Sequence, residues 1–149
     1  FEFVDFIFQA SVSASCFAQL KRHRMATIAP QPYICGAPVR IPESASGSEE
    51  IFHEAAEHSE QLYRKIADAA GREAAEYALL NAHLRRVLIG MNLRELYHFS
   101  RLRSDMHAQW EIRELSDRIC SLVRAEAPLA SVLLGGKDSF DGLKSRLGD

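Results

Sequence analysis

The densest group of polar and ring-bearing side chains in this sequence lies between Leu102 and Arg113, in the run Leu-Arg-Ser-Asp-Met-His-Ala-Gln-Trp-Glu-Ile-Arg. The run contains the only tryptophan of the chain, together with one histidine and two arginines. Asp105 precedes good helix formers, so it is expected to be the N-cap of a helix whose first turn holds His107. The N–H groups and partial positive charge of such a turn suit an anion or an electron-rich ring edge. A solvated amphipathic helix with a buried Trp110 is the alternative interpretation.

A second cationic group, Arg22-His23-Arg24, follows an apolar stretch far upstream. Taken alone, it is typical of cations that satisfy the last carbonyl groups of a short helix. The sequence has no Gly-rich phosphate loop, no Cys-x-x-Cys pair, no His-Glu-x-x-His and no nucleophile elbow. Dinucleotide binding of the usual Gly-rich kind therefore has no support.

The composition is that of an ordinary globular domain. The 149 residues are 47% hydrophobic and 26% charged, which suits a single domain with a genuine core. A formal net charge of −2 does not favour nucleic acid as a partner. No apolar run is long enough for a transmembrane helix, so no membrane association is expected. Cys16, Cys35 and Cys120 are widely spaced and form no metal or disulfide signature, which favours a reduced, cytoplasmic setting.

Apolar and polar residues alternate from Val4 to Ala10, and this period of two predicts a strand. Ser11–Ser15 carries turn and cap residues. Cys16–Arg24 is predicted to be a short helix with a cationic end. Four prolines and a glycine predict a loop without regular structure over Ala29–Ser48.

Helical spacing of apolar residues predicts one long amphipathic helix from Ile51 to Ala69, stopped at Gly71. A second helix is expected over Glu73–Leu80. Periodicity does not decide between helix and strand for Ala82–Met91.

The next helix is expected to begin at Asn92, with Glu95 completing a capping box. The helix that begins within the run from Leu102 to Arg113 is expected to continue to about Glu126 and to end at Pro128. A short helix over Leu129–Leu134 and a polar tail over residues 135–149 complete the prediction.

Together, Arg22-His23-Arg24 and the run from Leu102 to Arg113 resemble the motifs of the flavin-dependent thymidylate synthases, or thymidylate synthase complementing proteins. The resemblance extends from about Phe1 to about Pro128. It implies an α+β fold, with a small curved sheet and long packed helices, assembled as a homotetramer with its sites between subunits. It also favours a strand over His83–Met91. The family normally has a further segment ahead of this point, so residues 1–149 are expected to form one domain that lacks an N-terminal part.

The resemblance also implies roles for individual side chains. Arg103 matches a family residue that contacts the nucleotide. The other matches imply FAD binding, with phosphate and ring edges held by charged side chains and helix ends: Arg22, His23, Arg24, Asn92, Arg94 and His107. Neither a catalytic side chain nor a metal ligand is assigned, and no cysteine nucleophile is required.

The chain departs from the family pattern mainly where the nucleotide is expected to bind. Thr27 keeps a hydroxyl group in place of the family's Ser, but Ala29 replaces its Asn. Pro32 replaces a second Ser and Ile34 replaces an Arg, and losing an Arg that grips phosphate costs about 2–3 kcal/mol. Glu76 stands where the family has another nucleotide-binding Arg, and an acid there repels a phosphate.

Two further positions differ from the family. Phe3 replaces a His near the flavin, and Leu80 replaces a Pro. The flavin-binding set is thus mostly retained and the nucleotide-binding set is about half lost. The sequence leaves open whether Gln31 and Tyr33 build a new pocket in place of the lost residues.

The function implied by the resemblance is reductive methylation of deoxyuridylate (dUMP) to dTMP. The methyl carbon comes from methylenetetrahydrofolate, and NADPH reduces the FAD. One alternative is a divergent flavin-binding paralogue that acts on a different pyrimidine nucleotide or has lost catalysis. Another is a non-catalytic assembly subunit.

Overall fold

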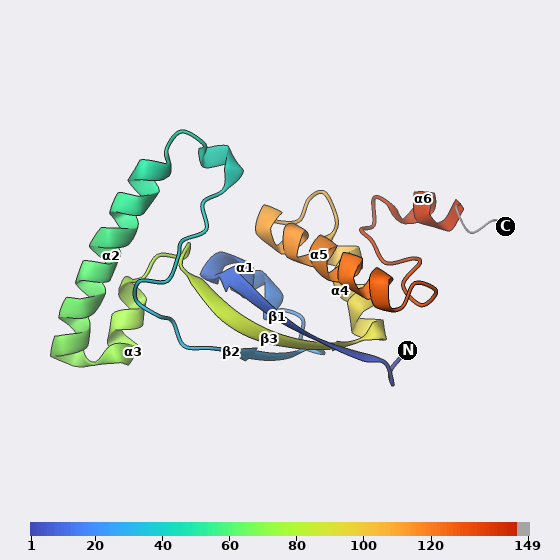
Figure 1. Ribbon diagram of the computed structural model, residues 1–149, viewed down its shortest axis with the longest axis horizontal. Coiled ribbons are helices and arrows are strands. Elements are labelled where there is room, and N and C mark those ends of the chain that lie inside the picture. The colour runs from blue at the N-terminus through green and yellow to red at the C-terminus, as the bar shows by residue number, and fades with distance from the viewer. Residues whose placement is uncertain (146–149) are drawn as a thin grey trace. The chain divides into compact units, whose positions relative to one another are not determined.

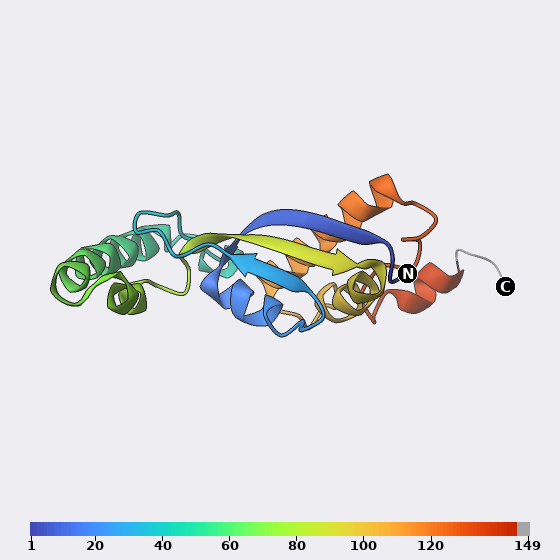
Figure 2. The same cartoon turned by 90° about the horizontal axis from the view of Figure 1, so that it is seen from below.

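The computed structural model describes residues 1–145, which divide into two compact units. The first unit comprises Phe1–Ala10, Gln19–Ala29 and the chain from Leu88 onward, and the second comprises Ser11–Ala18 and Pro30–Val87. The strands β1 (Asp5–Ser13), β2 (Thr27–Pro30) and β3 (Leu84–Asn92) form one sheet with β3 in the middle. Figure 2 shows β3 between the other two strands. A small open sheet accompanied by several helices confirms the predicted α+β class.

Strand β1 confirms the alternating pattern but runs further than predicted. Ser11–Ser13 continue the strand instead of forming a turn, because Val12 and Ser13 are buried. The helix α1 (Ala14–Leu20) follows directly, and the Ser13 hydroxyl oxygen accepts a hydrogen bond from the Cys16 N–H at 3.1 Å. The helix ends at Leu20, so the prediction that it reaches Arg24 is wrong.

Strand β2 lies partly in a segment that was predicted to be a loop. Pro30 has no N–H to donate, but β2 is an edge strand, where a sheet tolerates this loss. The chain beyond Pro30 is also less irregular than predicted. Val39 forms an isolated bridge with His83, and a short 3-10 helix, η1, spans Glu43–Ala45.

The long helix of the second unit is confirmed as α2 (Glu49–Ala70). It ends at Gly71, whose φ of +89° is a conformation that glycine adopts without strain, and whose N–H donates to the Ala67 carbonyl at 3.0 Å. The single helix predicted next is two short pieces, α3 (Arg72–Ala75) and the 3-10 helix η2 (Glu76–Ala78). Figure 1 shows α3 lying against the end of α2.

Two helices of the first unit, α4 (Leu93–Arg103) and α5 (Trp110–Glu126), pack against each other. Apolar side chains recur at helical spacing along both helices: Leu93, Leu96, Phe99, Ile112, Ile119 and Val123 are buried, and Leu102 and Leu115 are half-buried. These side chains form the core beneath the predicted site residues.

The C-terminal predictions require two corrections. Residues 128–133 form turns and not a helix, with the Ser131 N–H donating to the Ala127 carbonyl at 3.1 Å. Within the predicted polar tail, Phe140–Ser145 forms the helix α6, and the Arg101 guanidinium lies 5.3 Å from the centre of the Phe140 ring. This cation–π contact gives the segment a packing role that its polar composition concealed. Residues 146–149 lie outside the described part of the chain.

Among residues 1–145, no helix combines the length and the apolar character that crossing a membrane requires.

Candidate functional site

All seven predicted site residues belong to the first unit, at four places along its chain. Arg22 and Arg24 are exposed in the turn that follows α1. His23, from the same turn, is buried against Arg103 of α4. Asn92 and Arg94 stand at the start of α4, and His107 lies in the turn before α5.

His23 is the centre of a buried hydrogen-bonded network and is only 4% exposed. Its Nδ1 lies 3.0 Å from the Glu95 carboxylate, and its Nε2 accepts a hydrogen bond from Arg103 Nε at 2.9 Å. A guanidinium N–H can only donate, so Nε2 must carry a lone pair. The ring is therefore neutral and protonated on Nδ1, which donates to Glu95.

Arg103 is fixed by two further hydrogen bonds. Its two terminal nitrogens donate to the side-chain oxygen and to the backbone carbonyl of Gln19, both at 3.1 Å. Gln19 comes from the last turn of α1. Contacts on three nitrogens define the plane of the half-buried guanidinium, which a single ion pair would leave free to rotate.

Burial lowers the pKa of His23 below its ordinary value of 6.5. The hydrogen bond and charge of Glu95 act in the opposite direction, whereas the charges of Arg103 and His98 lower the pKa further. The Phe99 ring covers the imidazole at a centroid distance of 4.9 Å. The surroundings therefore keep the ring neutral near pH 7.

The start of α4 confirms one half of the predicted capping box and corrects the other. The Asn92 side-chain oxygen accepts from the Glu95 N–H at 2.9 Å, as an N-cap should. The Glu95 side chain does not return to the cap, because its carboxylate faces His23 and is 5% exposed. Glu95 is thus a member of the buried network that the capping interpretation did not anticipate.

Arg94 lies beside a cavity of about 580 Å³ with mostly apolar walls. Its guanidinium pairs with Glu2, and the cavity is lined by these two residues and by Phe1, Phe3, Tyr97 and Leu133. The Arg94 side chain is 74% exposed, and ion pairs at such positions contribute only about 0–1 kcal/mol. A ligand with a planar ring and a polar edge could therefore exchange places with Glu2 at little cost.

The surroundings of His107 correct the predicted helix start in the run from Leu102 to Arg113. Asp105 accepts from the His107 N–H at 3.0 Å within a turn, and the helix α5 begins only at Trp110. Its N-cap is Gln109, whose side-chain oxygen accepts from the Ile112 N–H at 2.9 Å. The prediction that His107 sits in the first turn of a helix is wrong. His107 is exposed and its backbone N–H is already hydrogen-bonded to Asp105, so the imidazole is the group that we expect a ligand to contact.

Several positions at which the chain departs from the family pattern share one cavity in the second unit, of about 530 Å³. Pro32, Ile34 and Glu76 line it together with Gln31 and Tyr33, so these last two residues do help to build a pocket. Other residues of its lining are Cys35, Tyr63, Arg72 and Arg86.

Gln31 is held from two sides at this cavity. Arg86 Nε donates to its side-chain oxygen at 3.0 Å, and Arg85 Nε donates to its carbonyl at 2.8 Å. The Arg85 guanidinium also lies 4.2 Å from the centre of the Tyr33 ring and 4.9 Å from that of Phe17. These cation–π contacts set the shape of the segment that carries the substituted residues.

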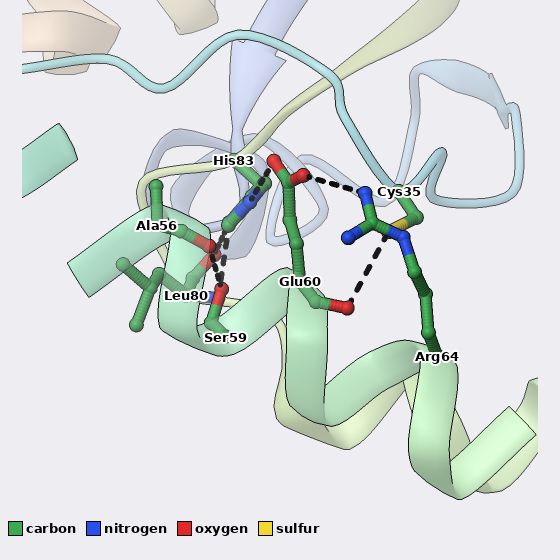
Figure 3. Close-up of polar contacts among 7 residues, drawn as sticks. All are labelled: Cys35, Ala56, Ser59, Glu60, Arg64, Leu80 and His83. Atoms are coloured by element: carbon green, nitrogen blue, oxygen red, sulfur yellow. Dashed lines mark hydrogen bonds and ion pairs between the residues drawn. The ribbon is translucent and has the colours of Figure 1, made fainter. Parts of the chain in front are cut away.

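A separate polar cluster fastens α2 to the residues before β3 (Figure 3). His83 is fully buried, with Nδ1 accepting from the Leu80 N–H at 3.0 Å and Nε2 lying 3.7 Å from the Glu60 carboxylate. Glu60 also pairs with Arg64 at 3.3 Å, and its carbonyl accepts from the Cys35 thiol at 3.8 Å. These contacts join backbone segments of the second unit, so we assign the cluster to structure and not to ligand binding.

Gln19 and Glu95 are the two members of the Arg103 network that the sequence interpretation missed. Gln19 carries no local signal, since a glutamine in a short helix is unremarkable. For Glu95 a signal existed, because an acid is expected either at the cap or beside a nearby cation. Only the fold decides between these roles.

Comparison with known proteins identifies a family. The family model described as thymidylate synthase complementing protein matches residues 1–129. A flavin-dependent thymidylate synthase of Geobacter sulfurreducens is 35% identical over 127 residues, covering 78% of this chain and 55% of that protein. One from Clostridium tetani is 34% identical over 155 residues, covering 85% and 61% respectively.

A third relative has a less informative name. The UPF0159 protein Ta1429 of Thermoplasma acidophilum is 29% identical over 151 residues, covering 99% of this chain and 30% of that protein. The chain therefore spans between about a third and three fifths of the length of these curated relatives.

Proposed function

Since the chain belongs to the thymidylate synthase complementing protein family, we propose that it is a flavin-dependent thymidylate synthase-like protein. The proposed reaction is reductive methylation of dUMP to dTMP, with methylenetetrahydrofolate as carbon donor and NADPH as reductant. The proposed assembly is a homotetramer in the cytoplasm. The observation that carries the proposal is the buried network in which His23 of the first motif and Arg103 of the second are hydrogen-bonded at 2.9 Å.

The residues around Arg94 fit a flavin. The aromatic and aliphatic walls of the cavity suit a planar ring system, and the exposed guanidinium can donate to its polar edge. We propose that Arg94 and Asn92 hold FAD with Arg22, His23, Arg24 and His107. When bound, FAD would supply the hydride chemistry that no side chain can provide.

Arg103 is proposed to orient the nucleotide. Its guanidinium plane is fixed by Gln19 and His23, so it can donate to a ring oxygen or phosphate without first losing rotational freedom. Positioning of this kind lowers the entropic cost of binding and is the main contribution that the chain's own residues make.

A divergent paralogue with another substrate is the second candidate, and the cavity around Ile34 favours it. Glu76 adds a carboxylate to a lining that also contains Arg72 and Arg86, so the net positive charge of the lining is smaller than two arginines alone would provide. A ligand with a neutral or zwitterionic group at this point fits such a lining better than a phosphate does.

The test is spectroscopic and kinetic. We expect the purified protein to be yellow with bound FAD, and reduced flavin to be oxidised faster when dUMP and methylenetetrahydrofolate are added. Replacing Arg103 by Lys should lower this response at least tenfold, because lysine lacks the planar set of N–H donors that the guanidinium group provides. The matched control is Arg101→Lys, an exposed position on the same helix.

Three results separate the candidates. Bound FAD that responds to dUMP supports the synthase. Bound FAD that does not respond to dUMP, but does respond to another pyrimidine nucleotide, supports the divergent paralogue. A colourless protein that still assembles supports a non-catalytic assembly subunit and contradicts both flavin proposals.

A further inference from the structure

We propose that Glu95 and His23 are positioning residues, which orient the Arg103 guanidinium through one directional hydrogen-bond chain that requires a neutral imidazole. This inference rests on the proposed function, because Arg103 is the residue assigned there to the nucleotide. It gives His23 a role toward Arg103 in addition to the flavin contact proposed above.

The direction of the chain follows from the chemistry of its members. Arg103 Nε can only donate, so it requires a lone pair on His23 Nε2, 2.9 Å away. The proton must then lie on Nδ1, which needs an acceptor, and Glu95 supplies one at 3.0 Å. Reversing any one bond places two donors face to face, so only one protonation pattern satisfies all three residues.

The geometry explains why an intermediary is needed. Glu95 stands in the first turn of α4 and Arg103 at its end, eight residues apart and therefore about 12 Å along the axis. The carboxylate cannot reach the guanidinium over that distance. The imidazole, entering from the turn after α1, bridges the two ends of the helix.

The charges around the ring make the chain sensitive to protonation. The groups that face His23 are Glu95, His98 and Arg103 from α4, and the apolar Phe99 ring packs beside it. A proton on Nε2 would oppose Arg103 Nε with a second donor and a like charge. Arg103 would have to leave its position, and nucleotide binding would weaken as pH falls through the depressed pKa of His23.

The test combines nitrogen-15 NMR of the 149-residue chain with kinetics on the flavin-loaded protein. In the wild type, we expect the imidazole signals of the tautomer protonated on Nδ1, and an Arg103 Nε–H signal that shifts as His23 titrates. Replacement of Glu95 by Gln should allow the other tautomer and shift the Arg103 signal. It should also raise the KM for dUMP about tenfold, with a smaller effect on kcat.

The pH below which the KM for dUMP rises, the acid limb of the KM profile, provides a second readout. This pH would not change if Glu95 had a purely structural role. Because Glu95 raises the pKa of His23, the Glu95→Gln variant should show this limb at lower pH than the wild type. The matched control is His98→Gln, whose ring lies 5.7 Å from that of His23 but outside the hydrogen-bond chain. This control should keep the wild-type tautomer and the wild-type KM at neutral pH, and its acid limb should move to higher pH, opposite to that of Glu95→Gln, because the charge of His98 lowers the pKa of His23.

The proposal is overturned if His23 is protonated on Nε2 in the wild type, or if Glu95→Gln leaves the Arg103 signal unchanged. If Glu95→Gln does not fold, the wild-type titration decides, because an Arg103 signal that ignores His23 also overturns the proposal. A wild-type protein that never responds to dUMP refutes the proposed function alone, since the NMR result is obtained without substrate.

Discussion

The state of a single imidazole links stability to pH in this protein. Burial holds the pKa of His23 below 6.5, so the unfolded chain takes up this proton more readily than the folded one. Protonation of His23 therefore has no effect on the free energy of unfolding at neutral pH. Destabilisation begins as pH falls through about 6.5 and levels off below the folded-state pKa. For one titrating group, the free energy of unfolding cannot change by more than about 1.4 kcal/mol per pH unit.

We accordingly predict that the free energy of unfolding falls between pH 7 and pH 5.5, and that His23→Gln removes part of this fall. Urea titrations followed by the fluorescence of Trp110 measure both. His53→Gln should retain the wild-type dependence, because His53 is an exposed residue of α2 and is not among the groups that shift the pKa of His23. Identical pH profiles for His23→Gln and the wild type would contradict the assignment.

Single side chains were predictable where a local rule governs them. Asn92 was correctly placed as the cap of α4, since the interaction involves only the next three residues. Glu95 satisfies the same local pattern, yet its carboxylate turns to a histidine 72 positions away. Local patterns carry no information about such partners, so the buried network could not be anticipated from the sequence.

Helices and strands were predicted well where periodicity is long and failed at their ends. The 22 residues of α2 contain several helical turns of consistent pattern, and Gly71 marks the end. The start of α5 was misplaced because Asp105 is a preferred cap and Gln109 is not, although Gln109 performs the capping. Strand β2 was missed because Pro30 suggested a loop, and only the sheet order shows that it stands at an edge.

The turn before α5 depends on a close approach that only glycine permits. A Cβ atom on Gly136 would lie 2.5 Å from the Ser104 carbonyl oxygen and 2.4 Å from an Asp138 carboxylate oxygen. We predict that Gly136→Ala lowers the free energy of unfolding by about 1–3 kcal/mol, because backbone must shift to admit the methyl group.

Gly142 offers the matched control for this substitution. It lies within α6, and a Cβ there would meet nothing within 4 Å among the described residues. Gly142→Ala should be neutral or stabilise by up to about 1 kcal/mol, as expected for alanine in a helix. Equal effects of the two substitutions in urea unfolding would show that the contact with Ser104 is not maintained in solution.

Across the chain as a whole, the three thiols differ in accessibility. Cys16 and Cys120 are buried and Cys35 is half-buried. Burial also raises the pKa of Cys120, despite the opposing charge of Arg124, so little reactive thiolate forms there at neutral pH. We predict that a thiol reagent modifies Cys35 of the native protein well before the other two. Labelling followed by peptide mass analysis measures the order, and rapid modification of Cys120 would contradict the fold of the first unit.

The retained site residues and three of the substituted positions belong to different units. The retained cationic and imidazole positions all belong to the first unit, whereas Pro32, Ile34 and Glu76 belong to the second. The resemblance identified the family correctly. It could not show that these three substitutions meet in one cavity, since that depends on how the chain folds between residues 34 and 76.

The hydrogen bonds that hold Gln31 have a consequence for substitutions at position 34. Arg85 and Arg86 grip its backbone and side chain, and the proline that follows stiffens the same segment. An arginine introduced at position 34 would therefore enter a cavity whose lining is already fixed by other side chains. Residues that share a cavity do not act additively. An exchange of Ile34 for arginine is therefore expected to need further exchanges among the residues that line the same cavity.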